Sequence, residues 1–140
     1  MNFPMTAALT GGFLIMLQSG LMMWTGFGRI KHNVAFGTGN VDELEKRARA
    51  HGNLAENAAI FVIALGLLEA SGMNSMVVMA LAATFVFARL SHAVGVGVLP
   101  TGDRDNPNIP RALGATATGL IGLTTGGLLI WQITAAMAAM

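Results

Sequence analysis

Two long uncharged stretches constrain the fold of this chain more than any other feature of its sequence. Residues 1–28 and 112–140 contain no Asp, Glu, Lys or Arg. A helix needs about 20 apolar residues to cross the hydrocarbon core of a membrane, and each stretch is longer than that. Only 11% of all residues are charged, whereas a soluble domain carries about 25%. The chain is therefore expected to reside in lipid.

Two further segments complete a set of four. Residues 70–88 are uncharged, and the apolar run continues past Arg89 to Leu99. The segment from about Asp42 to Ser71 has an uncharged core only in its second half. We predict an all-α membrane protein with one domain, residues 1–140, in which four transmembrane helices form an up-and-down antiparallel bundle. The predicted spans are approximately 4–28, 42–71, 74–99 and 110–136.

Residues typical of helix ends punctuate these segments. Asn40 stands three residues before Glu43, which predicts a capped start of the second helix. Ser71-Gly72 can end that helix and Asn74 can cap the next one. Asn106-Pro107 predicts the first turn of the last helix.

The distribution of Lys and Arg predicts the orientation in the membrane. Basic residues flank the first and third connections, while the second connection and both termini have none. By the positive-inside rule, the first and third connections are cytoplasmic and both termini lie on the opposite side. No Lys or Arg precedes Gly28, so we expect the first apolar segment to be retained as a span and not cleaved as a secretory signal.

A polar stripe runs into the second apolar segment. At about 100° per residue, Arg49, Asn53 and Glu56 fall within about 60° of one another on one helical face. Charged residues inside a membrane usually face the bundle interior and are paired. Arg49 has no carboxylate left to neutralise it, so it either extends to the lipid headgroups or binds an anion.

A second stripe on the third segment matches the first. Arg89 and His92 lie three residues apart, and antiparallel packing should place Arg89 at the depth of Glu56. We expect these two side chains to pair, either as a purely structural ion pair or as part of a ligand site. His92 alone is weak support for a site, because a lone His in a helix is more often a packed residue.

Several classes of site are excluded or disfavoured. The chain has no Cys, so it supplies no disulfide, thiolate nucleophile or Cys metal site. Its three His residues lack metal-ligand spacing with acidic residues, and we predict no metal site. A net charge of +1 without a basic cluster gives no reason to expect a nucleic-acid partner. Small residues four apart on the last helix, from Gly114 through Thr118 to Gly126, predict close helix packing.

The runs RAHGNLAEN (49–57) and FARLSH (87–92), within a four-span layout, resemble the MAPEG family, the membrane-associated proteins of eicosanoid and glutathione metabolism. The resemblance covers nearly the whole chain and is greatest to small bacterial members, which implies a bacterial inner membrane. It also implies a homotrimer that binds glutathione between neighbouring subunits, near the cytoplasmic side.

The resemblance assigns roles to particular residues. The glutathione-binding positions of the family correspond here to Arg29, Arg49, Asn53, Glu56, Arg89 and His92. The arginine that stabilises the glutathione thiolate corresponds to Arg111, with Arg104 as the alternate. A guanidinium beside the sulfur lowers the pKa of the thiol and creates the nucleophile.

The function implied is a glutathione-dependent transferase or peroxidase that acts on lipophilic electrophiles dissolved in membrane lipid. The chain has no tyrosine, and Val96 and Asn57 stand where relatives carry Tyr. That departure argues against eicosanoid synthesis, and the sequence specifies neither the electrophile nor the choice between conjugation and peroxide reduction. The alternative is a non-enzymatic trimeric membrane scaffold, or a small transporter in which Glu56, Arg89 and His92 relay protons.

Overall fold

A computed structural model describes residues 3–102 and 108–139, which form four α-helices. The helices are α1 (Met5–Lys31), α2 (Asp42–Ala70), α3 (Ser75–Gly97) and α4 (Ile109–Ala138). The described residues contain no β-strand. By length and composition, all four helices are able to cross a membrane. The predicted all-α fold is confirmed, with four helices long and apolar enough to span a membrane.

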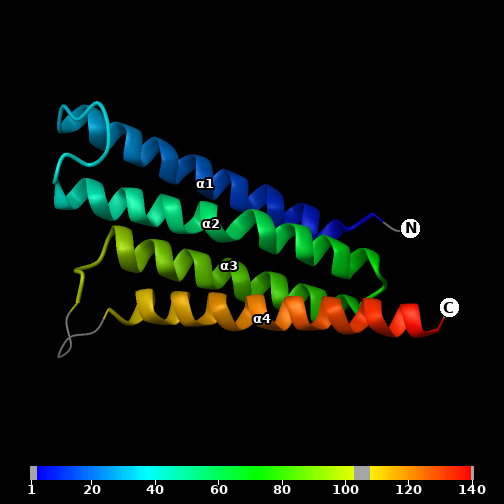
Figure 1. Ribbon diagram of the computed structural model, residues 1–140. Coiled ribbons are helices and arrows are strands. Elements are labelled where there is room, and N and C mark those ends of the chain that lie inside the picture. Colours follow the sequence, from blue (N-terminus) through cyan, green and yellow to red (C-terminus); the bar gives the residue numbers. More distant parts are fainter. Residues whose placement is uncertain (1–2, 103–107, 140) are drawn as a thin grey trace.

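The helices lie side by side in chain order, each antiparallel to the one before it (Figure 1). The start of α1 and the end of α4 lie at one end of the bundle, and the connection from α1 to α2 lies at the other. α2 contacts each of the other three helices, whereas α1 and α4 make no substantial contact with one another. The bundle is therefore built around α2 and α3, with α1 and α4 apart from one another.

The core lies mainly between α2 and α3. The rings of Phe61 and Phe85 stack with their centroids 3.7 Å apart, and Leu65, Leu68 and Val78 are fully buried. Large apolar side chains cover the outer surface of all four helices, as expected for a protein whose solvent is hydrocarbon. Packing, more than exclusion of water, must then hold the helices together.

Two helix ends follow the sequence signals. The Asn74 side chain accepts a hydrogen bond from the Met76 amide at 2.9 Å and caps α3. Ser71 is the C-cap of α2, and Gly72 follows in the left-handed conformation, φ 87°. The expected start at Asn106-Pro107 lies outside the described residues, and the cap of α4 is Asn108, whose side chain accepts from the Arg111 amide at 3.0 Å.

The predicted capping role of Asn40 is wrong. The N-cap of α2 is Val41, without a side-chain cap bond, and Asn40 has φ 58°. Gly37 and Gly39 are also left-handed, so this turn reverses the chain and carries Asn40 away from the helix end. Glu43, the expected partner of the cap, is engaged by side chains from α1 and its flank.

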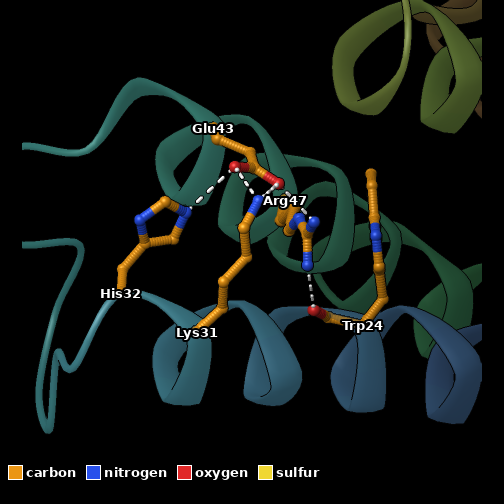
Figure 2. A network of polar contacts seen from close by, with 5 residues as sticks. All are labelled: Trp24, Lys31, His32, Glu43 and Arg47. Carbon is orange, nitrogen blue, oxygen red and sulfur yellow. Dashed lines mark hydrogen bonds and ion pairs between the residues drawn. The ribbon is translucent and has the colours of Figure 1, made fainter.

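Figure 2 shows these contacts, which we call the α1–α2 clasp: Trp24, Lys31, His32, Glu43 and Arg47. The Glu43 carboxylate bonds Lys31 Nζ at 3.0 Å and His32 Nε2 at 2.9 Å, and it also pairs with Arg47. Arg47 donates to the Trp24 carbonyl at 2.8 Å and lies 4.7 Å from the centre of its ring. The clasp fixes the end of α1 against the start of α2.

A carboxylate ties the same two helices together at the other end of the bundle. Glu69 accepts hydrogen bonds from the amides of Thr6 and Ala7, both at 2.9 Å. α1 has no side-chain cap of its own at this end, so Glu69 satisfies donors that the helix leaves open. Both ends of the α1–α2 pair are thereby held by a carboxylate from α2.

α2 extends beyond α3 at the end that carries the clasp. A Cβ placed on Gly97, the last residue of α3, would lie 3.5 Å from the Ala50 Cβ and 2.7 Å from the Trp24 ring. Gly97 is therefore level with Ala50, and residues 42–49 project past the end of α3. At 1.5 Å per residue this overhang is about 12 Å long, and the space beside it contains a polar cavity.

Candidate functional site

A polar cavity lies beside this overhang and has a volume of about 450 Å³. Its walls come from the start of α2, the end of α3 and the start of α4. The lining residues are Asp42, Glu45, Lys46, Arg49, Asn53, His92, Gly95, Val96, Thr101 and Arg111.

Four of the predicted site residues meet in this cavity. Arg49 and Asn53 come from α2, His92 from α3 and Arg111 from α4. Arg49 and Arg111 are exposed, Asn53 is half-buried and His92 is buried. The helical spacing that placed Arg49 beside Asn53 is thus realised, and antiparallel packing adds His92 and Arg111 from helices far away in sequence.

The charges in the cavity are arranged along α2. Asp42 and Glu45 lie on the outermost turn, while Arg49 and Asn53 lie one to three turns further in. Lys46 stands between the two groups. The inner part therefore offers cations and hydrogen-bond donors to an anion, and the outer part offers carboxylates to an ammonium group. A ligand that carries charges of both signs suits this arrangement.

Close backbone contact between α3 and α4 sets the position of Arg111. A Cβ on Gly95 would lie 2.4 Å from the Arg111 amide nitrogen. Asn108 adds hydrogen bonds from its side-chain nitrogen to the carbonyls of Gly95 (2.6 Å) and Pro100 (2.7 Å). Ser91 also donates to the Pro110 carbonyl at 2.9 Å. Arg111 is thus held on a rigid helix start beside the cavity.

Arg89 lies behind the cavity wall and is only 2% exposed. Its Nη1 donates to the carbonyl and the side-chain oxygen of Asn53, and its Nη2 donates to the Gly114 carbonyl and the Thr118 hydroxyl. All of these acceptors are neutral. Arg89 therefore joins α3 to both α2 and α4, and the cavity-lining residues do not include it.

The expected Glu56–Arg89 pair is wrong. All three ion pairs found in residues 3–102 and 108–139 converge on Glu43, and Glu56 is exposed. The packed face of α2 runs through Leu54 and Phe61, and Glu56 lies two residues, or about 200°, from Leu54. Glu56 therefore points away from α3, while Asn53, nearer to the packed face, takes its place beside Arg89.

A further predicted residue, Arg29, lies elsewhere. Arg29 is half-buried and donates from Nε to the Gly37 carbonyl at 3.2 Å, within the first connection. It does not line the cavity. Arg104 lies outside the described residues, so Arg111 is the thiolate-stabilising candidate that the structure places.

The sequence reasoning missed the three other charged residues of the cavity, Asp42, Glu45 and Lys46. Their spacing from Arg49, at intervals of three, four and seven residues, is the signal of a shared helical face. Asp42 was used only to mark the start of the second span, Lys46 counted only toward membrane orientation, and Glu45 was given no role. The first turn of a helix can belong to a site when that helix extends past its neighbour. The sequence did not define the end of α3 closely enough to predict this overhang.

A second cavity, of about 460 Å³, lies between α1 and α2 and is mainly apolar. It is lined by residues such as Leu14, Gln18, Ala58 and Val62, and none of its lining residues is titratable. Within the part of the chain that the structure describes, no cluster of three His, Asp or Glu side chains is placed to hold a metal ion. The polar cavity is therefore the better candidate for chemistry.

The chain was compared with known protein families. The sequence model of the MAPEG family matches residues 7–135 of the chain, which includes all but the ends of α1 and α4. Among curated proteins, no significant match was found.

Proposed function

Since the chain belongs to the MAPEG family, we propose that it is an integral membrane enzyme that uses glutathione as cosubstrate. It transfers glutathione to lipophilic electrophiles, or reduces lipophilic peroxides, from a site at the overhang of α2. The family covers membrane proteins of glutathione and eicosanoid metabolism, and four apolar helices indicate a multi-pass membrane protein. The activity and the ligand are the proposal.

The observation that carries the proposal is the convergence of Arg49, Asn53, His92 and Arg111 on one cavity. Glutathione has two carboxylates, one ammonium group and a thiol. Lys46 and Arg49 match the two carboxylates, Arg111 matches the thiolate, and the carboxylates of Asp42 and Glu45 match the ammonium group. The cavity thus offers a partner for each charge of the tripeptide.

Arg111 is the residue best placed to activate sulfur. A thiol with an ordinary pKa of about 8.5 is mostly protonated at neutral pH. A guanidinium next to the sulfur favours the thiolate, which is the reactive form. In conjugation, this thiolate forms a bond to an electrophilic carbon and the leaving group departs with its electron pair. In peroxide reduction, it attacks oxygen, and a second glutathione completes the disulfide as water and an alcohol form.

Glu56 supports a homotrimer as part of the same proposal. Its side chain is exposed on the isolated subunit, midway along a helix that is apolar enough to cross a membrane. A charged group in lipid costs about 2.5 to 3.5 kcal/mol at the helix centre, so such groups usually find partners. A neighbouring subunit, or glutathione bound between subunits, would provide one. With the first and third connections cytoplasmic, the cavity faces the compartment that contains glutathione.

The proton-relay alternative receives no support from the geometry. Arg89 is bonded to neutral groups of α2 and α4, and Glu56 points away from it. No hydrogen bond joins Glu56, Arg89 and His92 within the described ranges of the chain. The scaffold alternative leaves the convergence of cavity cations without a role.

The decisive experiment measures glutathione binding and thiolate absorbance on purified protein in detergent. We expect the wild type to bind glutathione at millimolar concentration or below and to show the ultraviolet absorbance of a thiolate. Arg111→Ala should remove most of that absorbance, and Arg49→Ala should weaken binding about tenfold, as loss of a charge-assisted hydrogen bond would. Lys31→Ala, an exposed cation outside the cavity, is the control and should bind normally. Wild-type protein without binding or thiolate would rule out the proposed function.

A further inference from the structure

Arg89 is a buried cation to which the structure gives only neutral partners. It is 2% exposed, and its bonds go to Asn53, Gly114 and Thr118. No ion pair of the described residues includes it. A buried charge without a counter-ion lowers stability, and Asp at position 53 would supply one without a change in side-chain size. The presence of Asn at that position therefore needs an explanation.

The contact with Arg89 fixes the orientation of the Asn53 amide. A guanidinium has donors but no acceptor, and an amide has an oxygen that accepts and an NH₂ group that donates. Only the oxygen of Asn53 can face Arg89, in agreement with the observed bond to Oδ1. Because Asn53 also lines the polar cavity, its NH₂ group is the end left for a ligand.

We propose that Arg89 is a positioning residue, which holds Asn53 with its NH₂ group toward the cavity so that this wall selects a carboxylate. The proposal rests on the proposed function, because the ligand it specifies is a carboxylate of the same bound molecule. The positive charge of Arg89 also favours an anion at this wall. A carboxylate bound to Asn53 would lie near Arg89 and partly compensate its charge.

A purely structural Arg89 would have the opposite consequence for substitutions. If Arg89 only joined α3 to α2 and α4, Asp at position 53 would serve it as well as Asn or better. The ligand would then be indifferent to the exchange. A variant that preserves the contact with Arg89 and changes only the group that residue 53 presents to the cavity therefore distinguishes the two roles.

Asn53→Asp is that variant. It keeps an acceptor for Arg89, adds a counter-ion, removes the NH₂ donor and places a negative charge at the cavity wall. We expect its thermal unfolding midpoint to equal or exceed that of the wild type, while its affinity for glutathione falls at least tenfold. Thr118→Val is the matched control, because it removes a different acceptor of Arg89 and leaves Asn53 in place. We expect Thr118→Val to lower the midpoint and to leave glutathione affinity within about twofold.

Titration with succinate, a dicarboxylate with neither thiol nor ammonium group, separates this inference from the proposed function. If the wild type binds succinate but not glutathione, and Asn53→Asp abolishes succinate binding, the inference stands and the proposed function falls. If Asn53→Asp binds glutathione as the wild type does, the inference is overturned and the proposed function stands. A lower midpoint for Asn53→Asp, or a wild type that binds neither compound, also overturns the inference.

Discussion

Arg47 and Arg89 are two arginines that the bundle accommodates in different ways. Arg47 pairs with Glu43 and lies over Trp24 within the α1–α2 clasp. Arg89 donates only to amide, carbonyl and hydroxyl oxygens, and its guanidinium carbon lies 5.7 Å from the centre of the Phe85 ring. The first arrangement neutralises a charge and joins two helices. The second leaves positive charge next to the cavity, where an anion would benefit from it.

Asn108 offers a test of how one side chain positions the site. Asn108→Ala removes the cap of α4 and the hydrogen bonds to the carbonyls of Gly95, near the end of α3, and Pro100, just after it. Loss of a cap costs about 1 kcal/mol, and we expect at least this loss in the free energy of unfolding, measured by denaturation in detergent. Thiolate absorbance with glutathione should also fall, because Arg111 loses the residue that holds its helix start.

Asn108→Asp separates the two effects. The carboxylate retains the acceptor for the Arg111 amide and loses the donors to Gly95 and Pro100. We expect most of the cap energy to be retained and the thiolate signal to be reduced. Equal thiolate absorbance in wild type and both variants would show that Arg111 does not depend on Asn108.

At the scale of single residues, the helical period was sufficient to place Arg49 beside Asn53. It was insufficient for Glu56, because the period gives the angle between residues and not which face packs against α3. In the structure, Leu54 and Phe61 lie on that face. Several faces of α2 are apolar, so the sequence did not single out the one that packs against α3. Asn40 was misread for a related reason, since a capping sequence cannot report the left-handed turn that precedes it.

At the scale of helices, the α3–α4 contact depends on glycine. A Cβ on Gly114 would lie 2.6 Å from the Ala88 carbonyl oxygen and 2.6 Å from the His92 amide nitrogen. Both atoms belong to the backbone, which cannot move as a side chain can. The predicted seam of small residues is used at Gly114 and Thr118, whereas Gly122 and Gly126 have nothing within 4 Å of an added Cβ.

This difference predicts opposite results for the same substitution on one helix. Gly114→Ala forces α3 and α4 apart, and overpacking of this kind costs about 1 to 3 kcal/mol. Gly122→Ala, the matched control, gains helix propensity without a clash and should be neutral or slightly stabilising within the subunit. Thermal unfolding of both variants in the same detergent is the measurement. A midpoint for Gly114→Ala at or above that of Gly122→Ala would contradict the close contact.

At the scale of the whole molecule, long charge-free segments were enough to predict four antiparallel helices, since the membrane leaves few other ways to satisfy the backbone. The overhang of α2 was not predictable in the same way. It arises because α3 ends at Gly97, level with Ala50, whereas α2 extends eight residues further to Asp42. The cavity exists because α2 extends past α3. In the sequence, its residues appear only as polar positions on separate helices.

The proposed homotrimer is tested by native mass measurement in mild detergent. We expect a trimer as the main species, because Glu56 and the outer face of α4 are exposed on the single subunit. Glu56→Leu should retain the fold and shift the population toward smaller species if the carboxylate is held by a neighbour. Ile63→Leu, a change at another exposed position of α2, is the control. A wild type that is monomeric at all detergent concentrations would contradict an intersubunit site.

The packing of Trp24 makes this residue an intrinsic fluorescent probe of the cavity. Its indole ring lies against Arg47 and against Gly97, which directly follows the cavity residues Gly95 and Val96. Trp131, the other tryptophan, is 61% exposed near the far end of α4. Brominated lipids or detergents should quench the emission of Trp131 and spare that of Trp24. In a Trp131→Phe background, the remaining fluorescence would then report the spacing of α1, α2 and α3 while the cavity fills, without any label attached to the chain.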